Sequence, residues 1–320
     1  MLNIADKNAF LKRFWSLLPD YITDILKIAY FLILPDCIMT FRSVCDNIIR
    51  KNKRKCVMYR IGRSGGYGLD ISDEGFASVK ESGMNFLEYS AGREPYVEAR
   101  DFAKLANKYD IKLWTCHLPY RPYERGDASS PLREVREAAF ARFSEEIKKA
   151  ADVGIDKFVL HPGTPFEDES ERPERLKYAA DFANELAELA AREGAVVAVE
   201  DMPHCIGRSI DELETIISAN DKLRICFDAN HLLNDTHSDF IDRLGDKIIT
   251  VHFSDYDFIE ERHWVPTDGK IDWVPLIKKL YGAGYNGPWM YECSLRGRTD
   301  EDFYKLAAGI LKEAGVPENM

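Results

Sequence analysis

The sequence lacks closely spaced cysteines. Its seven cysteines stand singly at positions 37, 45, 56, 116, 205, 226 and 293, and no Cys-x-x-Cys pair occurs in the 320 residues. An odd number of scattered thiols does not suit a disulfide framework. We therefore predict reduced cysteines and a cytoplasmic protein.

Positive charge is also scarce. The chain has 43 Lys and Arg against 54 Asp and Glu, which gives a formal net charge of −11. A protein that binds nucleic acid normally needs a basic face, because that face displaces the counterions of the phosphates. The charge balance therefore argues against DNA or RNA as a partner.

No apolar run is long enough to span a bilayer. The most apolar window covers residues 21–41, but its unbroken part runs only from Ile28 to Leu34. A membrane helix needs ~20 apolar residues, and no small-x-small cleavage site of a secretory signal follows. We expect no membrane partner. We predict that residues 1–57 form a peripheral N-terminal helical extension, with a basic linker at 50–56.

A dinucleotide-binding G-x-G-x-x-G loop is missing as well. The glycine-rich stretch "GRSGGYG" at 62–68 lacks that spacing, which disfavours an open doubly wound sheet. From residue 59 onward, short apolar runs instead alternate with helical patterns. Eight of these runs are candidate strands, at 59–62, 85–90, 112–117, 157–161, 196–200, 223–228, 248–252 and 289–292.

Helical spacing occupies the segments between these runs. Residues 134–154 and 174–194 carry apolar residues at i, i+3 and i+4 intervals, and each segment ends in glycine. Ser209, with Glu212 three residues later, has the pattern of a capping box. Apolar strands that alternate with helices indicate a parallel sheet covered by helices. Eight such units predict an α/β fold, a (β/α)8 TIM barrel over residues 58–320.

The ends of six successive predicted strands carry side chains that can bind a metal ion. These strand ends hold His117, His161, Glu200, Asp228, His252 and Glu292, and the loops after them hold His231, Asp255, Glu261 and His263. In such barrels the functional residues lie at this end, because the strand ends and the following loops converge there.

Each residue alone has a simpler explanation. A histidine at a strand end is often structural, Glu200 could form a salt bridge in the barrel mouth, and Asp228 could cap a helix. Together, however, one imidazole nitrogen and several carboxylate oxygens suit a divalent cation. The pattern therefore predicts a site for Mn²⁺, Co²⁺, Mg²⁺ or Zn²⁺.

A set of short motifs follows in a fixed order: "HLPY", "VLHPG", "VAVEDMP", "CFDANH", "VHFSD", "RHWVPTDGKIDW" and "YECS". In these motifs, over residues 59–315, the chain resembles the xylose isomerase-like TIM-barrel superfamily. That superfamily includes sugar-phosphate isomerases and epimerases and the endonuclease IV enzymes. The resemblance implies one divalent ion held by Glu200, Asp228, His252 and Glu292. In the loop at 262–273, Thr267 and Asp268 stand where the family usually has Gly and Glu.

The isomerase and epimerase branch implies proton transfer beside a carbonyl, through a metal-stabilised enediolate. Glu200 and Glu292 would be its catalytic residues. The substrate would be a small sugar or sugar phosphate, contacted by His117, His161, His231, His263, Arg262 and Trp114. Arg121 and Arg296 could also meet a phosphate. Residues 121–132 are either a lid or a long loop, and the barrel could form a homo-oligomer.

The endonuclease IV branch is the main alternative, a zinc phosphodiesterase that acts on abasic DNA. Its ligands for three zinc ions fall on His117, His161, Glu200, Asp228, His231, His252, Glu261, His263 and Glu292, with Glu261 in place of the usual Asp. The stretch "VEDMPHC" lacks the Thr-Ala-Gly run of that branch, and the chain is acidic, so an isomerase or epimerase is favoured. Dehydratase chemistry stays open. So does a non-catalytic sugar-binding barrel, although the complete set of metal ligands argues against it.

Overall fold

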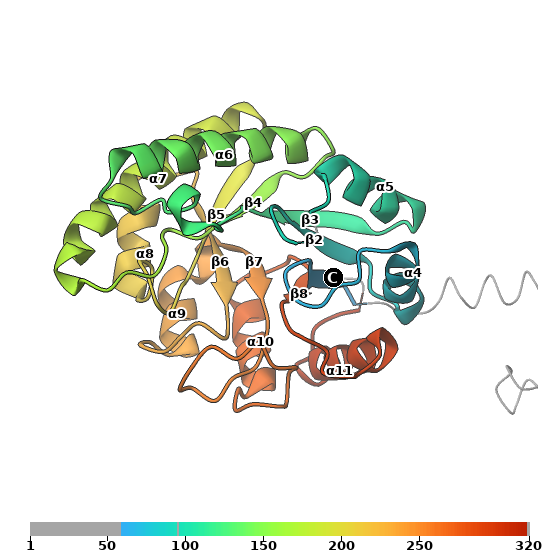
Figure 1. The fold of residues 1–320 in the computed structure, drawn as a ribbon. Coiled ribbons are helices and arrows are strands. Elements are labelled where there is room, and N and C mark those ends of the chain that lie inside the picture. The colour runs from blue at the N-terminus through green and yellow to red at the C-terminus, as the bar shows by residue number, and fades with distance from the viewer. Residues whose placement is uncertain (1–58, 95, 319–320) are drawn as a thin grey trace, which may run out of the picture. The chain divides into compact units, whose positions relative to one another are not determined.

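A computed structural model describes residues 59–94 and 96–318 (Figure 1). The expected N-terminal extension, residues 1–57, lies outside the described residues. None of the described helices is long and apolar enough to cross a membrane.

Eight strands form one parallel sheet, in the order β7-β6-β5-β4-β3-β2-β1-β8. From β1 to β7 each strand pairs with the next in the chain, and β8 pairs with β1. The prediction of a TIM barrel is confirmed, and every strand lies within two residues of its predicted position. The strands are β1 (Ile61–Ser64), β2 (Phe86–Ser90), β3 (Lys112–His117), β4 (Lys157–Leu160), β5 (Val196–Glu200), β6 (Arg224–Asp228), β7 (Ile248–His252) and β8 (Trp289–Tyr291).

The barrel closes just beyond the ends of β7 and β8. Phe253 forms a parallel bridge with Tyr291. The N–H of Phe253 donates to the carbonyl of Met290 at 2.9 Å, and its carbonyl accepts from the N–H of Glu292 at 3.1 Å. This closure places His252 and Glu292 on adjacent strands, although 40 positions separate them in the sequence.

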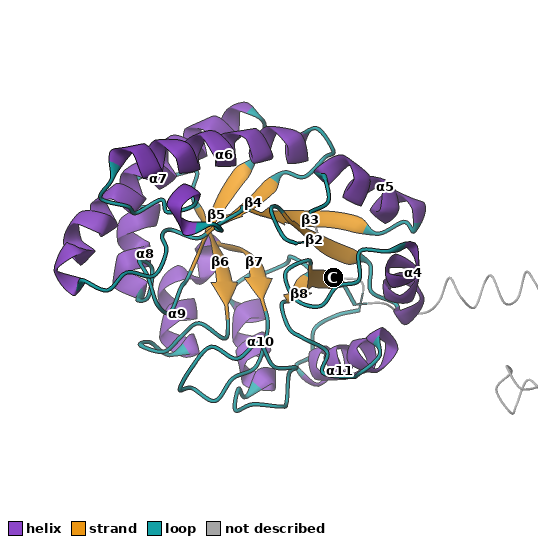
Figure 2. Ribbon diagram, viewed as in Figure 1, coloured by secondary structure: helices purple, strands orange, loops and turns teal. Residues whose placement is uncertain are grey.

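One α-helix follows each strand and packs on the outside of the barrel (Figure 2). These helices are α4 (Asp73–Ser82), α5 (Ala99–Lys108), α6 (Arg133–Ala151), α7 (Arg172–Arg192), α8 (Ile210–Ile217), α9 (His237–Leu244), α10 (Trp273–Gly282) and α11 (Asp300–Glu313). Short 3₁₀ turns lie in the connections, at η2 (Tyr123–Arg125), η3 (Glu169–Glu171) and η4 (Gly245–Lys247).

The helix boundaries follow from local chemistry. The chain leaves α6 and α7 through Gly154 (φ 90°) and Gly194 (φ 73°), which adopt the left-handed conformation that favours glycine. At α8 the side chain of Ser209 accepts the N–H of Glu212, as predicted. The carboxylate of Glu212 departs from a full capping box, because it accepts the N–H groups of Gly207 and Arg208.

Strand alternation decides which side chains enter the barrel. Phe158, Val197 and Ile225 belong to the large core between strands and helices, whereas Val159, Ala198 and Cys226 form a small separate cluster inside the barrel. Side chains two positions further along a strand point the same way. The inward faces of β4, β5 and β6 therefore continue from small apolar residues into His161, Glu200 and Asp228.

The loop after β7 is organised by one buried carboxylate, Asp255. Its Oδ1 accepts the N–H groups of Tyr256 (2.9 Å) and Ile271 (3.1 Å). Its Oδ2 accepts the N–H of Thr267 (2.8 Å) and the indole N–H of Trp273 (2.9 Å). Thr267 sits at φ 78°, a left-handed conformation that strains a β-branched residue. Asp255 is therefore a structural anchor that holds Thr267 in this conformation.

Replacing Asp255 with alanine should lower the free energy of unfolding by about 3 kcal/mol, because several buried donors lose a charged acceptor. The measurement is urea-induced unfolding followed by tryptophan fluorescence. The matched control is Asp246→Ala in η4, where the carboxylate is largely exposed and a change within about 0.5 kcal/mol is expected. Equal effects of the two substitutions would contradict the anchoring role of Asp255.

Candidate metal centre

Four side chains converge at the carboxyl ends of β5, β6, β7 and β8. Glu200, Asp228, His252 and Glu292 each offer one ligand atom, and these atoms all lie within 4.8 Å of one another. All four residues are buried. The set combines three carboxylates with one imidazole, a donor set typical of Mn²⁺, Co²⁺, Mg²⁺ or Zn²⁺.

His252 lies between carboxylates on both sides of its ring. Its Nδ1 is 2.7 Å from Oε1 of Glu200 and 3.3 Å from Oε2 of Glu292. Its Nε2 is 2.9 Å from Oε2 of Glu88. The Nδ1 atom is therefore the one that faces the other candidate ligands. Burial opposes ionisation of Glu292, but the neighbouring His252 lowers the pKa of Glu292 to about 2.

Asp228 supplies a direct sign that a cation fits here. Its Oδ1 accepts the N–H of Asn230 at 2.7 Å, whereas its Oδ2 is buried without a hydrogen-bond partner among the described residues. Nε2 of His231 is equally unsatisfied and lies 3.6 Å from this Oδ2. Burial raises the pKa of Asp228 to about 6. Buried polar atoms without partners are costly, and a bound cation would satisfy them.

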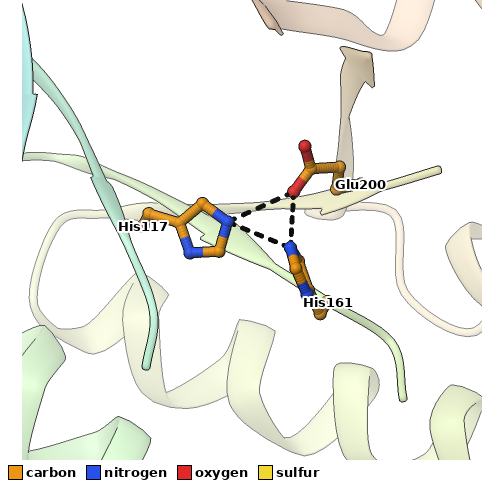
Figure 3. A group of neighbouring side chains, drawn as sticks. All are labelled: His117, His161 and Glu200. Carbon is orange, nitrogen blue, oxygen red and sulfur yellow. Dashed lines mark hydrogen bonds and ion pairs between the residues drawn. The ribbon is translucent and has the colours of Figure 1, made fainter. Parts of the chain in front are cut away.

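A second group lies beside the first and shares Glu200. His117 and His161 point their Nε2 atoms at each other and at Oε2 of Glu200 (Figure 3). The two Nε2 atoms are 3.0 Å apart, and they lie 3.3 Å and 3.0 Å from that oxygen. Burial opposes charge on both rings. Glu200 nevertheless raises the pKa of His117 to about 9, whereas burial prevails at His161 and lowers its pKa.

A third group consists of His231, Glu261 and His263. Oε1 of Glu261 is 2.6 Å from Nε2 of His263 and 3.8 Å from Nε2 of His231. Although Glu261 is largely buried, the neighbouring imidazoles of His231 and His263 lower its pKa. This third group differs from the first two in lacking Glu200.

Backbone carbonyls orient three of these histidines. Nδ1 lies within hydrogen-bond distance of a main-chain oxygen in His117 (Leu118, 2.9 Å), His231 (Asp201, 2.7 Å) and His263 (Glu292, 2.9 Å). A carbonyl only accepts, so Nδ1 carries a proton, and Nε2 is the ring nitrogen turned toward the pocket. This is the arrangement found in metal-binding histidines.

Glu292 of this centre lines an open pocket. Its lining includes all four flanking histidines, His117, His161, His231 and His263. Two tyrosines cover them: the ring of Tyr67 stacks on His263 at 3.9 Å, and that of Tyr120 on His161 at 4.4 Å between centroids. The pocket walls thus combine flat aromatic faces with hydrogen-bonding groups, as expected for a small polar ligand.

The loop at 121–132 forms one wall of this pocket. Arg121 and Tyr123 line the pocket, whereas residues 126–130 are buried. Asp127 accepts the N–H of Thr164 at 3.3 Å and pairs with Arg175 at 3.0 Å. The second half of the loop is therefore anchored to the neighbouring β4–α7 connection. The first half, residues 121–125, is exposed, and the carbonyl of Arg121 accepts a hydrogen bond from Arg142 at 2.6 Å.

Two of the expected substrate-binding residues lie away from the pocket. The ring of Trp114 is 4.1 Å from the ammonium group of Lys157, which begins β4, so it lies toward the opposite end of the barrel from the centre. Arg262 turns outward and pairs with Asp257 at 3.1 Å. Of the three arginines considered for a phosphate, the pocket lining includes Arg121 but neither Arg262 nor Arg296.

Glu88 and Tyr67 are contributions to the site that sequence reasoning missed. Glu88 lies between the apolar residues Leu87 and Tyr89 of β2. A charged residue at a strand position that faces the barrel interior was the sequence signal that could have identified it. Tyr67 follows the glycines of the loop after β1. Gly66 allows that loop to pass close to Glu292, because a Cβ there would lie 2.8 Å from a carboxylate oxygen of Glu292.

Comparison with known proteins identifies the family of this barrel. A family model described as xylose isomerase-like TIM barrel matches residues 76–314. The chain therefore belongs to this family.

Two curated relatives match part of the chain. An uncharacterized protein of Methanocaldococcus jannaschii is 27% identical over 196 residues, 60% of this chain and 70% of that protein. A protein of Finegoldia magna named "Probable endonuclease 4" is 28% identical over 175 residues, 50% of this chain and 60% of that protein. The second alignment thus spans less than two thirds of the relative's length.

Among solved structures, a D-tagatose 3-epimerase-like protein superposes with a TM-score of 0.71 at 20% identity, covering 80% of this chain and 98% of that one. At this identity the likeness establishes the shared fold.

Divalent cations should stabilise the chelator-treated protein. At a Mn²⁺ concentration one hundred times the Kd, binding to the folded state adds about 2.7 kcal/mol to the free energy of unfolding. We expect this gain to disappear in the double variant Asp228→Asn, Glu292→Gln. It should persist in Glu301→Gln, whose side chain is exposed on α11. Thermal unfolding with and without Mn²⁺ measures the effect, and equal gains in both variants would place the ion elsewhere.

Proposed function

We propose that this protein is a divalent-metal-dependent isomerase or epimerase of a small sugar or sugar phosphate, which transfers a proton through an enediolate. One observation carries the proposal: the carboxylates of Glu200 and Glu292 approach the same ring nitrogen of His252 from different strands, and Glu292 lines the pocket. Two carboxylates placed on different strands in this way could contact a bound ligand from two sides.

The reaction needs a group that removes a carbon-bound proton beside a carbonyl and a group that returns it. The low pKa of Glu292 keeps this carboxylate ionised at neutral pH, so it can accept a proton. Glu200 is the second carboxylate of the pair, and His252, together with His117 and His161, keeps its pKa low despite burial. A divalent ion held by Glu200, Asp228, His252 and Glu292 would supply stabilisation of negative charge on oxygen.

The pocket lining suits a polyhydroxylated substrate. Tyr67 and Tyr120 offer aromatic faces for a sugar, and the Nε2 atoms of His117 and His231 can meet hydroxyl groups. Arg121 forms no ion pair with a carboxylate in the described part of the chain, and its guanidinium lies 5.7 Å and 5.5 Å from the rings of Tyr120 and Tyr123. An unpaired guanidinium at the rim could receive a phosphate.

Glu200→Gln and Glu292→Gln should each reduce turnover by about 10²-fold or more, because each removes one proton-transferring carboxylate. The assay is a panel of ketoses and aldoses in D₂O with Mn²⁺, Co²⁺ or Zn²⁺ restored. Deuterium should enter the carbon beside the carbonyl. The matched control is Glu145→Gln on α6, an exposed residue. Full turnover by the metal-free protein, or turnover without deuterium exchange, would contradict the mechanism.

A second function is favoured by a specific observation, the two flanking groups. His117 with His161, and His231 with Glu261 and His263, would give each of two further ions its own donors. Three neighbouring zinc ions suit phosphodiester hydrolysis of abasic DNA. Against this function, the chain carries a net charge of −11, and Arg121 is the one Lys or Arg side chain among the residues that line the pocket. A DNA backbone would meet little positive charge there.

Metal stoichiometry separates the two functions. Elemental analysis should find about one tightly bound divalent ion per chain, since the proposed isomerase needs only the central four ligands. The variant His161→Ala should still bind that ion. The wild-type protein should not cleave duplex DNA that contains an abasic site. Close to three zinc ions per chain, together with salt-sensitive binding to abasic DNA, would favour the phosphodiesterase instead. One tightly bound ion without turnover of any sugar would point to a binding barrel.

A further inference from the structure

Glu88 is a buried carboxylate inside the barrel, below the candidate metal centre. Its neighbours in β2, Leu87 and Tyr89, belong to the core between strands and helices, so Glu88 faces the interior. No Lys or Arg of the described chain pairs with it. Its contacts are instead two hydroxyl groups and one imidazole: Ser64 Oγ at 2.7 Å, Thr115 Oγ1 at 2.8 Å and His252 Nε2 at 2.9 Å.

The strand register places these donors beside Glu88. Ser64 in β1 and Thr115 in β3 are the residues that pair with Glu88 in the sheet. Both hydroxyls donate to the carboxylate, which only accepts, and one goes to each oxygen. The third donor, His252, comes from β7 across the barrel and approaches the same oxygen as Thr115. The three contacts hold Glu88 in one orientation.

The fold does not require a carboxylate at this position. Elsewhere in the barrel interior, Val159, Ala198 and Cys226 fill the space with small apolar side chains. A buried carboxylate costs free energy even when it is hydrogen-bonded. The presence of a carboxylate inside the barrel therefore indicates a role other than packing.

The contact with His252 defines that role. Because a carboxylate accepts only, Nε2 of His252 carries the proton that it donates to Glu88. The ring is then held with Nδ1 toward Glu200 and Glu292, at 2.7 Å and 3.3 Å. Without Glu88, the ring could rotate or present its other nitrogen. A carboxylate that holds the far nitrogen of a metal-binding histidine both orients the ring and strengthens it as a donor.

Ser64 extends the arrangement to a second candidate ligand. Its Oγ lies 2.7 Å from Oε1 of Glu88 and 3.1 Å from Oε1 of Glu292. The Oγ atom of Ser64 also accepts the N–H of Gly66 at 3.0 Å, and this hydrogen bond fixes the position of the hydroxyl. Glu88 thus contacts one of the four candidate ligands, His252, directly, and Ser64 lies between Glu88 and a second, Glu292.

We propose that Glu88 is a positioning residue of the metal centre, which holds His252 in the arrangement that binds a divalent cation. The inference rests on the metal centre of the proposed function. It adds that the affinity for the cation depends on a residue that does not itself contact the ion.

The test measures Mn²⁺ binding to the chelator-treated full chain by isothermal titration calorimetry. Glu88→Gln keeps the shape of the side chain, and we expect it to raise the Kd for Mn²⁺ by about 10- to 100-fold. Glu88→Leu also removes the acceptor for His252 and should raise the Kd further. The matched control is Thr250→Val, a substitution at a buried residue whose hydroxyl has no hydrogen-bond partner within the described part of the chain. It should leave the Kd nearly unchanged.

A second readout distinguishes positioning from a general loss of packing. Nitrogen-15 NMR of the His252 ring should show Nε2 protonated in the Mn²⁺-free wild type and a changed distribution of ring protons in Glu88→Leu. If the wild type binds Mn²⁺ tightly and Glu88→Gln has the same Kd, the inference is overturned and the proposed function stands. An equal loss of affinity in Thr250→Val also overturns it. Tight, Glu88-dependent binding without turnover of any sugar supports the inference and refutes the proposed reaction.

Discussion

Mutual repulsion among buried carboxylates is the constraint on which the centre of this protein depends. Glu200, Asp228 and Glu292 bring three acidic groups within 4.8 Å of one another and of His252. In a buried site such charges need compensation by donors or by a cation. Part of this compensation comes from histidines and main-chain N–H groups, which the closure of β7 on β8 helps to bring together. One oxygen of Asp228 still has no hydrogen-bond partner among the described residues, and a divalent ion would satisfy it.

The same four residues fit two chemistries, and the surroundings separate them. The flanking histidines are oriented with Nε2 toward the pocket, which suits either hydrogen bonds to a sugar or further zinc ions. Tyr67 and Tyr120 cover these histidines with aromatic faces, which suits a small cyclic or linear polyol. The relatives reflect the same division, since they include a protein named as a probable endonuclease and a fold neighbour named as epimerase-like. Our preference for the sugar rests on the net charge of −11 and on the presence of one Lys or Arg side chain, that of Arg121, among the residues that line the pocket.

Structural support reaches well beyond the residues that face the pocket. Asp255 holds the loop that carries His263, and Asp127 fixes the wall that carries Arg121. Glu88 supports His252 from inside the barrel. Each of these carboxylates is buried and saturated with hydrogen bonds, so each holds one geometry. Proton transfer depends on such positioning, because small displacements of the reacting groups are costly.

The sequence by itself determined the eight strands, the order of strands and helices, and the set of metal-competent residues at the strand ends. These features follow from local rules: apolar runs of strand length, helical spacing, and alternation that turns every second side chain inward. Only the tertiary structure decided the direction of Arg262, the remote place of Trp114, the anchoring by Asp255 and the role of Glu88. Those depend on contacts across the barrel, such as that between Glu88 and His252, which are 164 residues apart. No local pattern encodes such a contact, because it exists only once the sheet has closed on itself.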